Sequence, residues 1–212
     1  MKKKILILVV AIILFVVISG GILCSGVFEQ TTEIDNKFLT GTIQGKANEN
    51  REVLSPELGA AYDDFANTNR YVFGMADSLL FYSEFFEKMG AKKITPQTYN
   101  GIVWNIYVIS PPVYKEIFNE SAYGYLCVAS GKNGDYFIEV SSLMLNADET
   151  LQSELFIRYT KPLLESIEFK DPENPPSEYL QLDFRKEGFD YVKQYVKEYG
   201  WDSYLEKRRN FY

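Results

Sequence analysis

The functional groups available in this sequence are mainly carboxylates and aromatic rings, because its 212 residues include no histidine. Without imidazole, a Ser-His-Asp triad, a Cys-His pair, a histidine metal ligand and a histidine proton shuttle are all excluded. The sequence also has no glycine-rich nucleotide or phosphate motif and no G-x-S-x-G nucleophile elbow. We therefore expect no cofactor, no metal ion and no assigned catalytic residue, and we consider catalysis only through Asp and Glu.

Two pairs of acidic residues are the candidates for acid-base catalysis, Asp63 with Asp64 and Glu84 with Glu87. Glycosidases use two carboxyl groups that face one cleft, about 5–9 Å apart. Glu84 and Glu87 lie opposite the apolar stripe of a predicted helix, so we expect them to face solvent. An Asp/Glu-dependent cell-envelope glycan hydrolase is kept as the alternative function. It requires a deep groove with two facing carboxylates, one of them with a raised pKa.

Aromatic residues make up 16 % of the chain, and Trp104, Tyr107 and Tyr125 lie in segments of strand character. Such rings offer flat apolar faces with a polar tip, so these three are candidates for an aromatic surface that binds a sugar or a peptide. The same spacing also suits side chains that pack in the core of a sheet. The sequence leaves both interpretations open.

Two further residues carry modification chemistry. Asn119-Glu120-Ser121 is an N-glycosylation sequon, which makes Asn119 a candidate glycosylation site if the segment is exported and exposed. Cys127 is the only cysteine besides Cys24, and it lies between Leu126 and Val128. A disulfide within the domain is therefore excluded, and we expect Cys127 to be a buried, unreactive thiol.

The N-terminus predicts a transmembrane signal-anchor helix over residues 5–26. Lys2–Lys4 precede an apolar segment, and no charged residue occurs from Ile5 to Phe28. About 20 helical residues span the hydrocarbon core of a bilayer. The lysines orient the N-terminus toward the cytoplasm and place the rest of the chain outside the cell membrane. The lipid bilayer is the first expected partner.

Two other interpretations of this segment remain open. A cleaved signal peptide begins in the same way, and Ser19–Gly21 supplies small residues for a cleavage site. A lipoprotein would carry its lipid on Cys24, although the preceding residue, Leu23, is larger than expected there. All three interpretations place the domain outside the cytoplasmic membrane.

Charge separates the two sides of this predicted membrane span. The whole chain has a formal net charge of −7 and a pI of about 4.8. Without Lys2–Lys4 it holds 19 basic and 29 acidic residues, for a net charge of −10. An acidic domain of this kind is a poor nucleic-acid binder, because phosphate contacts need clustered Lys and Arg.

The downstream pattern predicts an α+β fold. In 136–141, Tyr136, Ile138 and Val140 alternate with Phe137, Glu139 and Ser141, which indicates one buried face. The predicted elements are strands at 38–43 and 70–75, a helix at 78–89, a hairpin at 92–109 around Asn100-Gly101, a short helix at 113–118, a hairpin at 123–143 around Gly131–Gly134, a helix at 149–167 kinked at Pro162, and one or two amphipathic helices interrupted at Gly200.

These elements define the expected organisation of the chain, an anchor followed by a mainly antiparallel sheet flanked by helices. The predicted segments are a cytoplasmic stub at 1–4, the transmembrane helix at 5–26, a tether at 27–36, an extracytoplasmic α+β domain at 37–170, a Pro-rich joint at 171–180 and an amphipathic helical tail at 181–212.

Residues 91–170 run through two hairpins into a helix that ends in Leu164-Glu165-Ser166-Ile167-Glu168-Phe169. This order, with its "Ser-hydrophobic-x-Phe" ending, resembles PsbP-like domains. The resemblance implies an α/β/α sandwich around an antiparallel sheet, and a binding or scaffolding role with no catalytic residues to carry over. The family's first strand pair, with its Pro-x-x-Trp-like segment, is absent from residues 37–76.

The features together favour a single-pass, membrane-anchored extracytoplasmic protein that acts as a non-enzymatic binding or interaction module. Its expected partner, besides the bilayer, is a protein or a glycan at the outer surface. The apolar stripe of the tail, which includes Val192, Val196 and Trp201, could dock on a partner or pack on its own domain.

Overall fold

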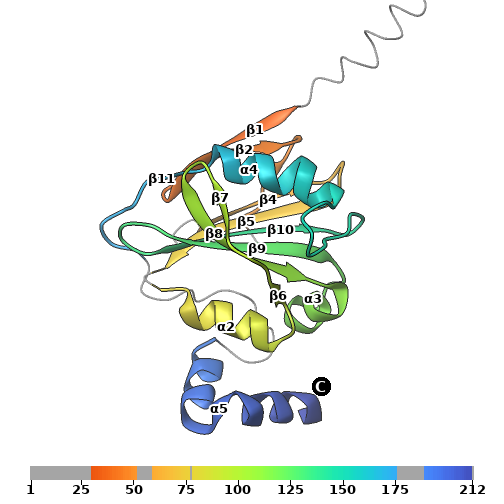
Figure 1. The fold of residues 1–212 in the computed structure, drawn as a ribbon, viewed down its shortest axis with the longest axis vertical. Helices are drawn as coiled ribbons and strands as arrows, with labels where there is room; N and C mark the ends of the chain where they lie inside the picture. Colours follow the sequence, from red (N-terminus) through yellow and green to blue (C-terminus); the bar gives the residue numbers. More distant parts are fainter. Residues whose placement is uncertain (1–29, 52–58, 77, 176–188, 212) are drawn as a thin grey trace, which may run out of the picture. The chain divides into compact units, whose positions relative to one another are not determined.

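The computed structural model describes residues 30–51, 59–76, 78–175 and 189–211, and it shows an α+β domain built on a large antiparallel sheet (Figure 1). The predicted stub, the transmembrane helix at 5–26 and Cys24 lie outside the described residues. Among the helices that are described, none is both long and apolar enough to cross a membrane.

The main sheet has the strand order β3-β4-β5-β10-β9-β8-β6, with β7 also paired to β8, and every pairing is antiparallel. A smaller sheet has the order β1-β2-β11. The strands are β1 (Thr31–Asp35), β2 (Leu39–Gln44), β3 (Asn48–Glu49), β4 (Gly59–Asp64), β5 (Asn69–Ala76), β6 (Lys92–Lys93), β7 (Gln97–Tyr99), β8 (Ile102–Ile109), β9 (Tyr123–Ser130), β10 (Asp135–Ser142) and β11 (Glu168–Phe169).

Helices cover both faces of the main sheet. The described helices are α2 (Leu80–Lys88), α3 (Pro111–Phe118), η1 (Leu155–Thr160, a π-helix), α4 (Lys161–Ser166) and α5 (Phe189–Phe211). One core lies under η1, α4 and the small sheet, and a second core lies under α2, α3 and α5. The strands between these two cores are therefore apolar on both faces.

Both predicted hairpins are confirmed, and their turns explain them. Asn100 and Gly101 have φ of 49° and 75°, the positive values that a two-residue type I′ turn requires between β7 and β8. Gly131–Gly134 closes the β9–β10 hairpin, with the Gly131 amide donating to the Gly134 carbonyl over 2.8 Å. The expectation that β10 has one buried face is wrong, because almost all of its side chains are buried.

The helix predicted at 149–167 begins later and has a different form. Leu151 has a φ of 59° and cannot be part of a right-handed helix, and the helical segment begins at Leu155 as the π-helix η1. The predicted disturbance at Pro162 takes the form of a π-helical turn before α4, which places the proline in the first turn, where its missing N–H is tolerated.

Parts of the predicted tether and of the Pro-rich joint belong to the folded domain. Within the tether, β1 pairs along its whole length with β2. Within the joint, a carboxylate oxygen of Asp171 accepts hydrogen bonds from the Lys132 amide (2.9 Å) and from the Tyr136 hydroxyl (3.1 Å). Neither feature is visible as a local sequence pattern, since both depend on distant partners.

The tail packs on its own domain through α5. Gly200, with φ 81° and ψ 165°, divides α5 into two helical segments, as its place in the sequence predicts. Val192 and Tyr204 are fully buried against the core under α2 and α3. The Trp201 ring stacks on Phe81 with centroids 5.1 Å apart. Most of the described apolar stripe is thus used within the domain, while Tyr199 remains exposed.

We expect Trp201→Ala to lower the free energy of unfolding by about 1–2 kcal/mol, because it removes a partly buried, stacked ring. Tyr199→Ala is the matched control, since this neighbouring ring is 56 % exposed, and its effect should stay within about 0.5 kcal/mol. Urea denaturation of both variants measures the difference. Equal values for the two would contradict the packing of α5 on α2.

Candidate functional site

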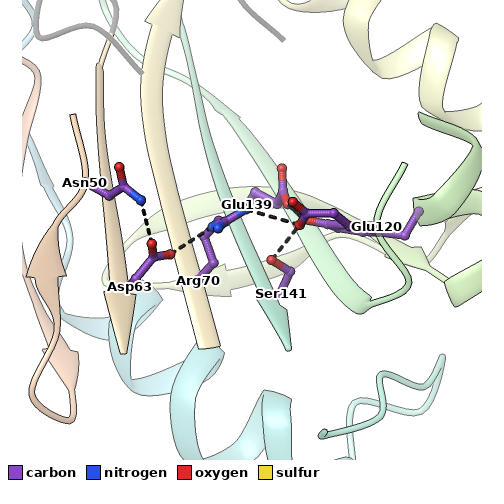
Figure 2. Close-up of polar contacts among 7 residues, drawn as sticks. Asn50, Asp63, Arg70, Glu120, Glu139 and Ser141 are labelled. Atoms are coloured by element: carbon purple, nitrogen blue, oxygen red, sulfur yellow. Dashed lines mark hydrogen bonds and ion pairs between the residues drawn. The ribbon is translucent and has the colours of Figure 1, made fainter. Parts of the chain in front are cut away.

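A cluster of charged side chains lies on the face of the sheet that carries α2 and α3. Antiparallel register places Arg70 of β5 opposite Asp63 of β4 on one side and opposite Ser141 of β10 on the other. Residues directly opposite in such a pair point to the same face, so the three side chains meet (Figure 2). Glu120, which follows α3, approaches the same arginine.

Arg70 is the centre of this cluster. Its guanidinium forms ion pairs with Asp63 at 2.8 Å and with Glu120 at 3.2 Å. Asp63 is only 7 % exposed and accepts a second hydrogen bond from the Asn50 side-chain amide over 2.6 Å. The nearby acids keep the pKa of Arg70 above its usual value, against an opposing effect of burial. Arg70 therefore stays charged and binds two carboxylates together.

Glu139 lies beside the cluster and is almost completely buried, at 2 % exposure. The Tyr114 hydroxyl donates to a Glu139 carboxylate oxygen over 2.7 Å and lies 3.0 Å from the Ser141 hydroxyl oxygen. Burial raises the pKa of Glu139 to about 7, although these hydroxyls and the charge of Arg70 act in the opposite direction. Glu139 can therefore hold or release a proton near neutral pH.

A small cavity of about 170 Å³ opens beside the cluster, with Asp63, Arg70, Tyr114, Glu120 and Ser141 in its wall. Exposed apolar side chains, Phe65 and Leu143, form part of its rim. Glu139 does not line the cavity, and the ion pairs with Arg70 engage both Asp63 and Glu120. The cavity is also smaller than the roughly 300–1,000 Å³ that is typical of ligand sites.

A second, larger groove of about 710 Å³ lies on the opposite side of the sheet. One wall is the edge segment that contains β6 and β7, and the other is the loop that leads into η1 together with the start of α4. Lys93, Thr95, Gln97 and Tyr99 come from the edge segment. Glu149, Thr150, Gln152 and Lys161 come from the other wall. The groove therefore combines amides, hydroxyls, charges and a tyrosine ring.

The loop wall of the groove is held in place from below by Tyr125. The buried Tyr125 hydroxyl accepts a hydrogen bond from the Asp148 amide over 2.8 Å and lies 3.0 Å from the Asp148 carbonyl and 2.8 Å from the Ser153 hydroxyl. The Asp148 carboxylate accepts hydrogen bonds from the amides of Thr150 (2.9 Å) and Gln152 (3.2 Å). Although slight burial acts against it, these bonds keep the pKa of Asp148 below its usual value. The loop is therefore preformed.

We expect Tyr125→Phe to lower the free energy of unfolding by about 1–2 kcal/mol, because it removes the hydroxyl that satisfies the Asp148 backbone while the ring remains. Hydrogen exchange of the amides in 148–153 should become faster, whereas exchange in β9 should stay slow. Thr98→Ala, which alters an exposed residue of β7, is the control. Unchanged exchange in the loop would contradict this role of Tyr125.

The predicted aromatic surface is not present. Trp104 and Tyr125 are fully buried in the core under α4, whereas Tyr107 is buried in the opposite core. Alternate side chains of β8 point to opposite faces, which separates Trp104 from Tyr107. The alternative, that these rings pack in the core of the sheet, is what the structure shows.

The acidic pairs do not face one another across a cleft. Asp63 turns toward Arg70, while the fully buried Asp64 accepts hydrogen bonds from the Ala66 and Asn67 amides in the β4–β5 turn. On α2, Glu84 accepts a hydrogen bond from the Trp201 indole, and Glu87 lies 3.9 Å from Lys93. Each of these four carboxylates therefore has a partner within the fold.

Asn119 is exposed and ends α3 in the left-handed conformation, with a φ of 60°. Its glycosylation stays a prediction. Cys127 is completely buried, and burial raises the pKa of its thiol far above the usual value. The expected burial of Cys127 is confirmed, and its lack of reactivity stays a prediction.

Neither the Arg70 cluster nor the groove was predicted from the sequence. A signal for Glu139 was present, since Phe137 precedes it on the same face of β10 and a large apolar side chain there argues against a solvated face. Arg70, Tyr114 and Glu120 offered no comparable signal, because only strand register brings them together. Within the described ranges, no group of acidic or cysteine side chains could hold a metal ion.

Comparison with known proteins finds no relative of this chain among protein families or curated proteins. No protein-family model matches the chain. No curated protein matches its sequence either.

Proposed function

We propose that this protein is a single-pass, membrane-anchored binding module whose domain lies outside the cytoplasmic membrane and binds its partner in the 93–99/149–161 groove. The membrane part of the proposal is supported by Lys2–Lys4 and by the uncharged apolar segment that precedes Glu29. The resemblance of residues 91–170 to PsbP-like domains would also imply a binding role.

The groove is the observation that carries the binding part of the proposal. Its volume, about 710 Å³, lies within the range that is typical of ligand sites. Its loop wall is fixed by Tyr125 and by the Asp148 carboxylate. A preformed wall lowers the entropy lost on binding, which is the property a binding surface needs.

The alternative, an Asp/Glu-dependent glycan hydrolase, keeps one favourable observation, the raised pKa of Glu139. However, Glu139 does not line the neighbouring cavity, and the carboxylates that do are engaged by Arg70 or by the β4–β5 turn. We therefore do not assign hydrolysis to this site.

Protease treatment of intact cells tests the location. A C-terminal epitope on the full chain should be lost when intact cells are exposed to a protease, while a cytoplasmic marker survives. An epitope that survives until the cells are lysed would contradict the proposed topology.

A further inference from the structure

We propose that one end of the domain docks on the surface of the bilayer through an apolar rim, which consists of Phe65, Tyr123, Leu143 and Met144. This contact, which rests on the proposed membrane anchor, is separate from the groove. The four side chains are 75 %, 36 %, 64 % and 77 % exposed. They are four of the nine large hydrophobic side chains that are exposed among the described residues, so nearly half of this exposed apolar surface belongs to the rim.

Contacts within the domain place the four side chains at one end of the main sheet. Phe65 lies in the β4–β5 turn, and Leu143 and Met144 directly follow β10. The Leu143 amide donates to the Thr68 carbonyl of that turn over 3.3 Å, and Phe65 and Leu143 line the same cavity. Tyr123 begins β9 opposite the last residue of β10. The rim is therefore formed by three segments that meet.

The chain enters the domain at this same end. β1 begins at Thr31, and the hydroxyl of the next residue, Thr32, donates to the Gly45 carbonyl over 2.9 Å. Gly45 in turn lies against the Asp64 side chain. Asp64 directly precedes Phe65, so the start of β1 lies beside the turn that carries the first residue of the rim.

The length of the chain limits the distance between this end and the predicted membrane span. The five peptide units from residue 26 to Thr31 reach at most about 18 Å when fully extended. The headgroup layer of the bilayer takes up about 5–8 Å of that reach. The rim is therefore held close to the lipid surface, where tethering gives it a high effective concentration.

The side chains of the rim suit the boundary between headgroups and acyl chains. Phe65, Leu143 and Met144 offer apolar surface that gains free energy on entering it. Tyr123 combines an apolar ring with a polar hydroxyl, the property that enriches tyrosine at membrane interfaces.

The acidic groups beside the rim do not prevent contact with lipid. Of the acids that line the neighbouring cavity, Asp63 and Glu120 pair with Arg70, and Asp64 is fully buried in the β4–β5 turn. Lys46, between β2 and β3, is exposed. A lysine at such a place can extend its ammonium toward headgroup phosphates.

Fluorescence quenching by spin-labelled lipid tests the docking. The full chain with Cys24→Ser and either Met144→Cys or Val103→Cys is labelled with a polarity-sensitive fluorophore and inserted into phosphatidylcholine nanodiscs, with and without a lipid that is spin-labelled near its headgroup. Val103 is the matched control, because it is also apolar and exposed but lies on β8 about 20 Å from the strand end at Ile109, which is the end nearest the rim. We expect blue-shifted emission at position 144, with quenching at least about threefold stronger than at position 103.

A second substitution in the labelled Met144→Cys chain locates the contact. Phe65→Ser should reduce the quenching at position 144 at least about twofold, because it removes the largest apolar side chain of the rim. Leu80→Ser should leave the quenching unchanged, since Leu80 is 76 % exposed on α2, away from the rim. Thermal unfolding of each variant separates loss of docking from loss of folding.

Three outcomes would overturn the docking. Equal quenching at positions 144 and 103, in a chain that elutes with the nanodiscs, would contradict the docking and leave the anchor intact. Blue-shifted emission at position 144 that the spin-labelled lipid does not quench would mean that protein, such as a second copy of the chain, covers the rim instead of lipid. A chain that does not elute with the nanodiscs would contradict both the anchor and the docking.

Discussion

Glu139→Gln is expected to raise the free energy of unfolding at pH 8 by on the order of 2–3 kcal/mol. In the folded protein the pKa of Glu139 is raised to about 7, whereas an exposed glutamate has a pKa near 4.5. Between these values the folded state keeps its proton while the unfolded state loses it. The unfolding free energy of the wild type therefore falls as the pH rises from about 4.5 to about 7, and it levels off above.

Glutamine removes this titration and still accepts the hydrogen bond from Tyr114, so the gain in stability should grow from about pH 4.5 to about pH 7 and stay constant above. Chemical denaturation at pH 5 and pH 8 measures both effects. Glu120→Gln is the control, because its side chain is 39 % exposed and its change should stay below about 1 kcal/mol. If the free energy of unfolding decreased equally between pH 5 and pH 8 in the wild type and in Glu139→Gln, a group other than Glu139 would be responsible for the titration.

Arg70→Met is expected to lower the free energy of unfolding by about 2–4 kcal/mol, because it leaves the buried Asp63 carboxylate without its cation. This expected loss of unfolding free energy is smaller than the loss from breaking a fully buried ion pair, because the Arg70 side chain is 32 % exposed. The positive charge of Arg70 also lowers the pKa of Glu139. Its removal should therefore move the pH-dependent loss of stability to higher pH.

Arg51→Met provides the matched control for this prediction. Arg51 pairs with Glu49 at 3.1 Å, but their side chains are 74 % and 40 % exposed, so the variant should change the free energy by less than about 0.5 kcal/mol. The double variant Arg70→Met/Asp63→Asn should recover part of the loss, because it removes the unpaired charge. Equal effects of Arg70→Met and Arg51→Met would contradict the central role of Arg70.

The elements that depend on neighbours in the sequence could be predicted. The Asn100-Gly101 turn defines the β7–β8 hairpin, and the stripe from Leu79 to Met89 defines α2. In both cases the pattern lies within one turn or one helix. The α+β class and the antiparallel pairing follow from these local units.

The elements that depend on distant partners could not be predicted. β4 reads Gly-Ala-Ala-Tyr-Asp-Asp, which has little strand character, and it forms because β5 pairs along its length. β1 is short and polar at most positions, and it depends in the same way on β2. Tertiary pairing overrides local propensity in both.

In the candidate sites too, single residues could be recognised from the sequence, but the contacts between distant residues could not. The charges of Arg70 and Glu139 are visible in the sequence, but their meeting depends on the β5–β10 register, which no local pattern contains. The groove needs two walls from segments about 50 residues apart, brought together by packing against the core. The predicted aromatic surface failed because strand spacing alone does not distinguish a packed ring from an exposed one.

Cysteine labelling in the groove tests the account most directly. A Cys24→Ser background should give little labelling with a membrane-impermeant maleimide, because the one remaining cysteine, Cys127, is buried. In intact cells, Gln97→Cys and Thr98→Cys should both be labelled without lysis, because both positions lie in the domain placed outside the membrane. Labelling that needs cell lysis would contradict a domain outside the membrane.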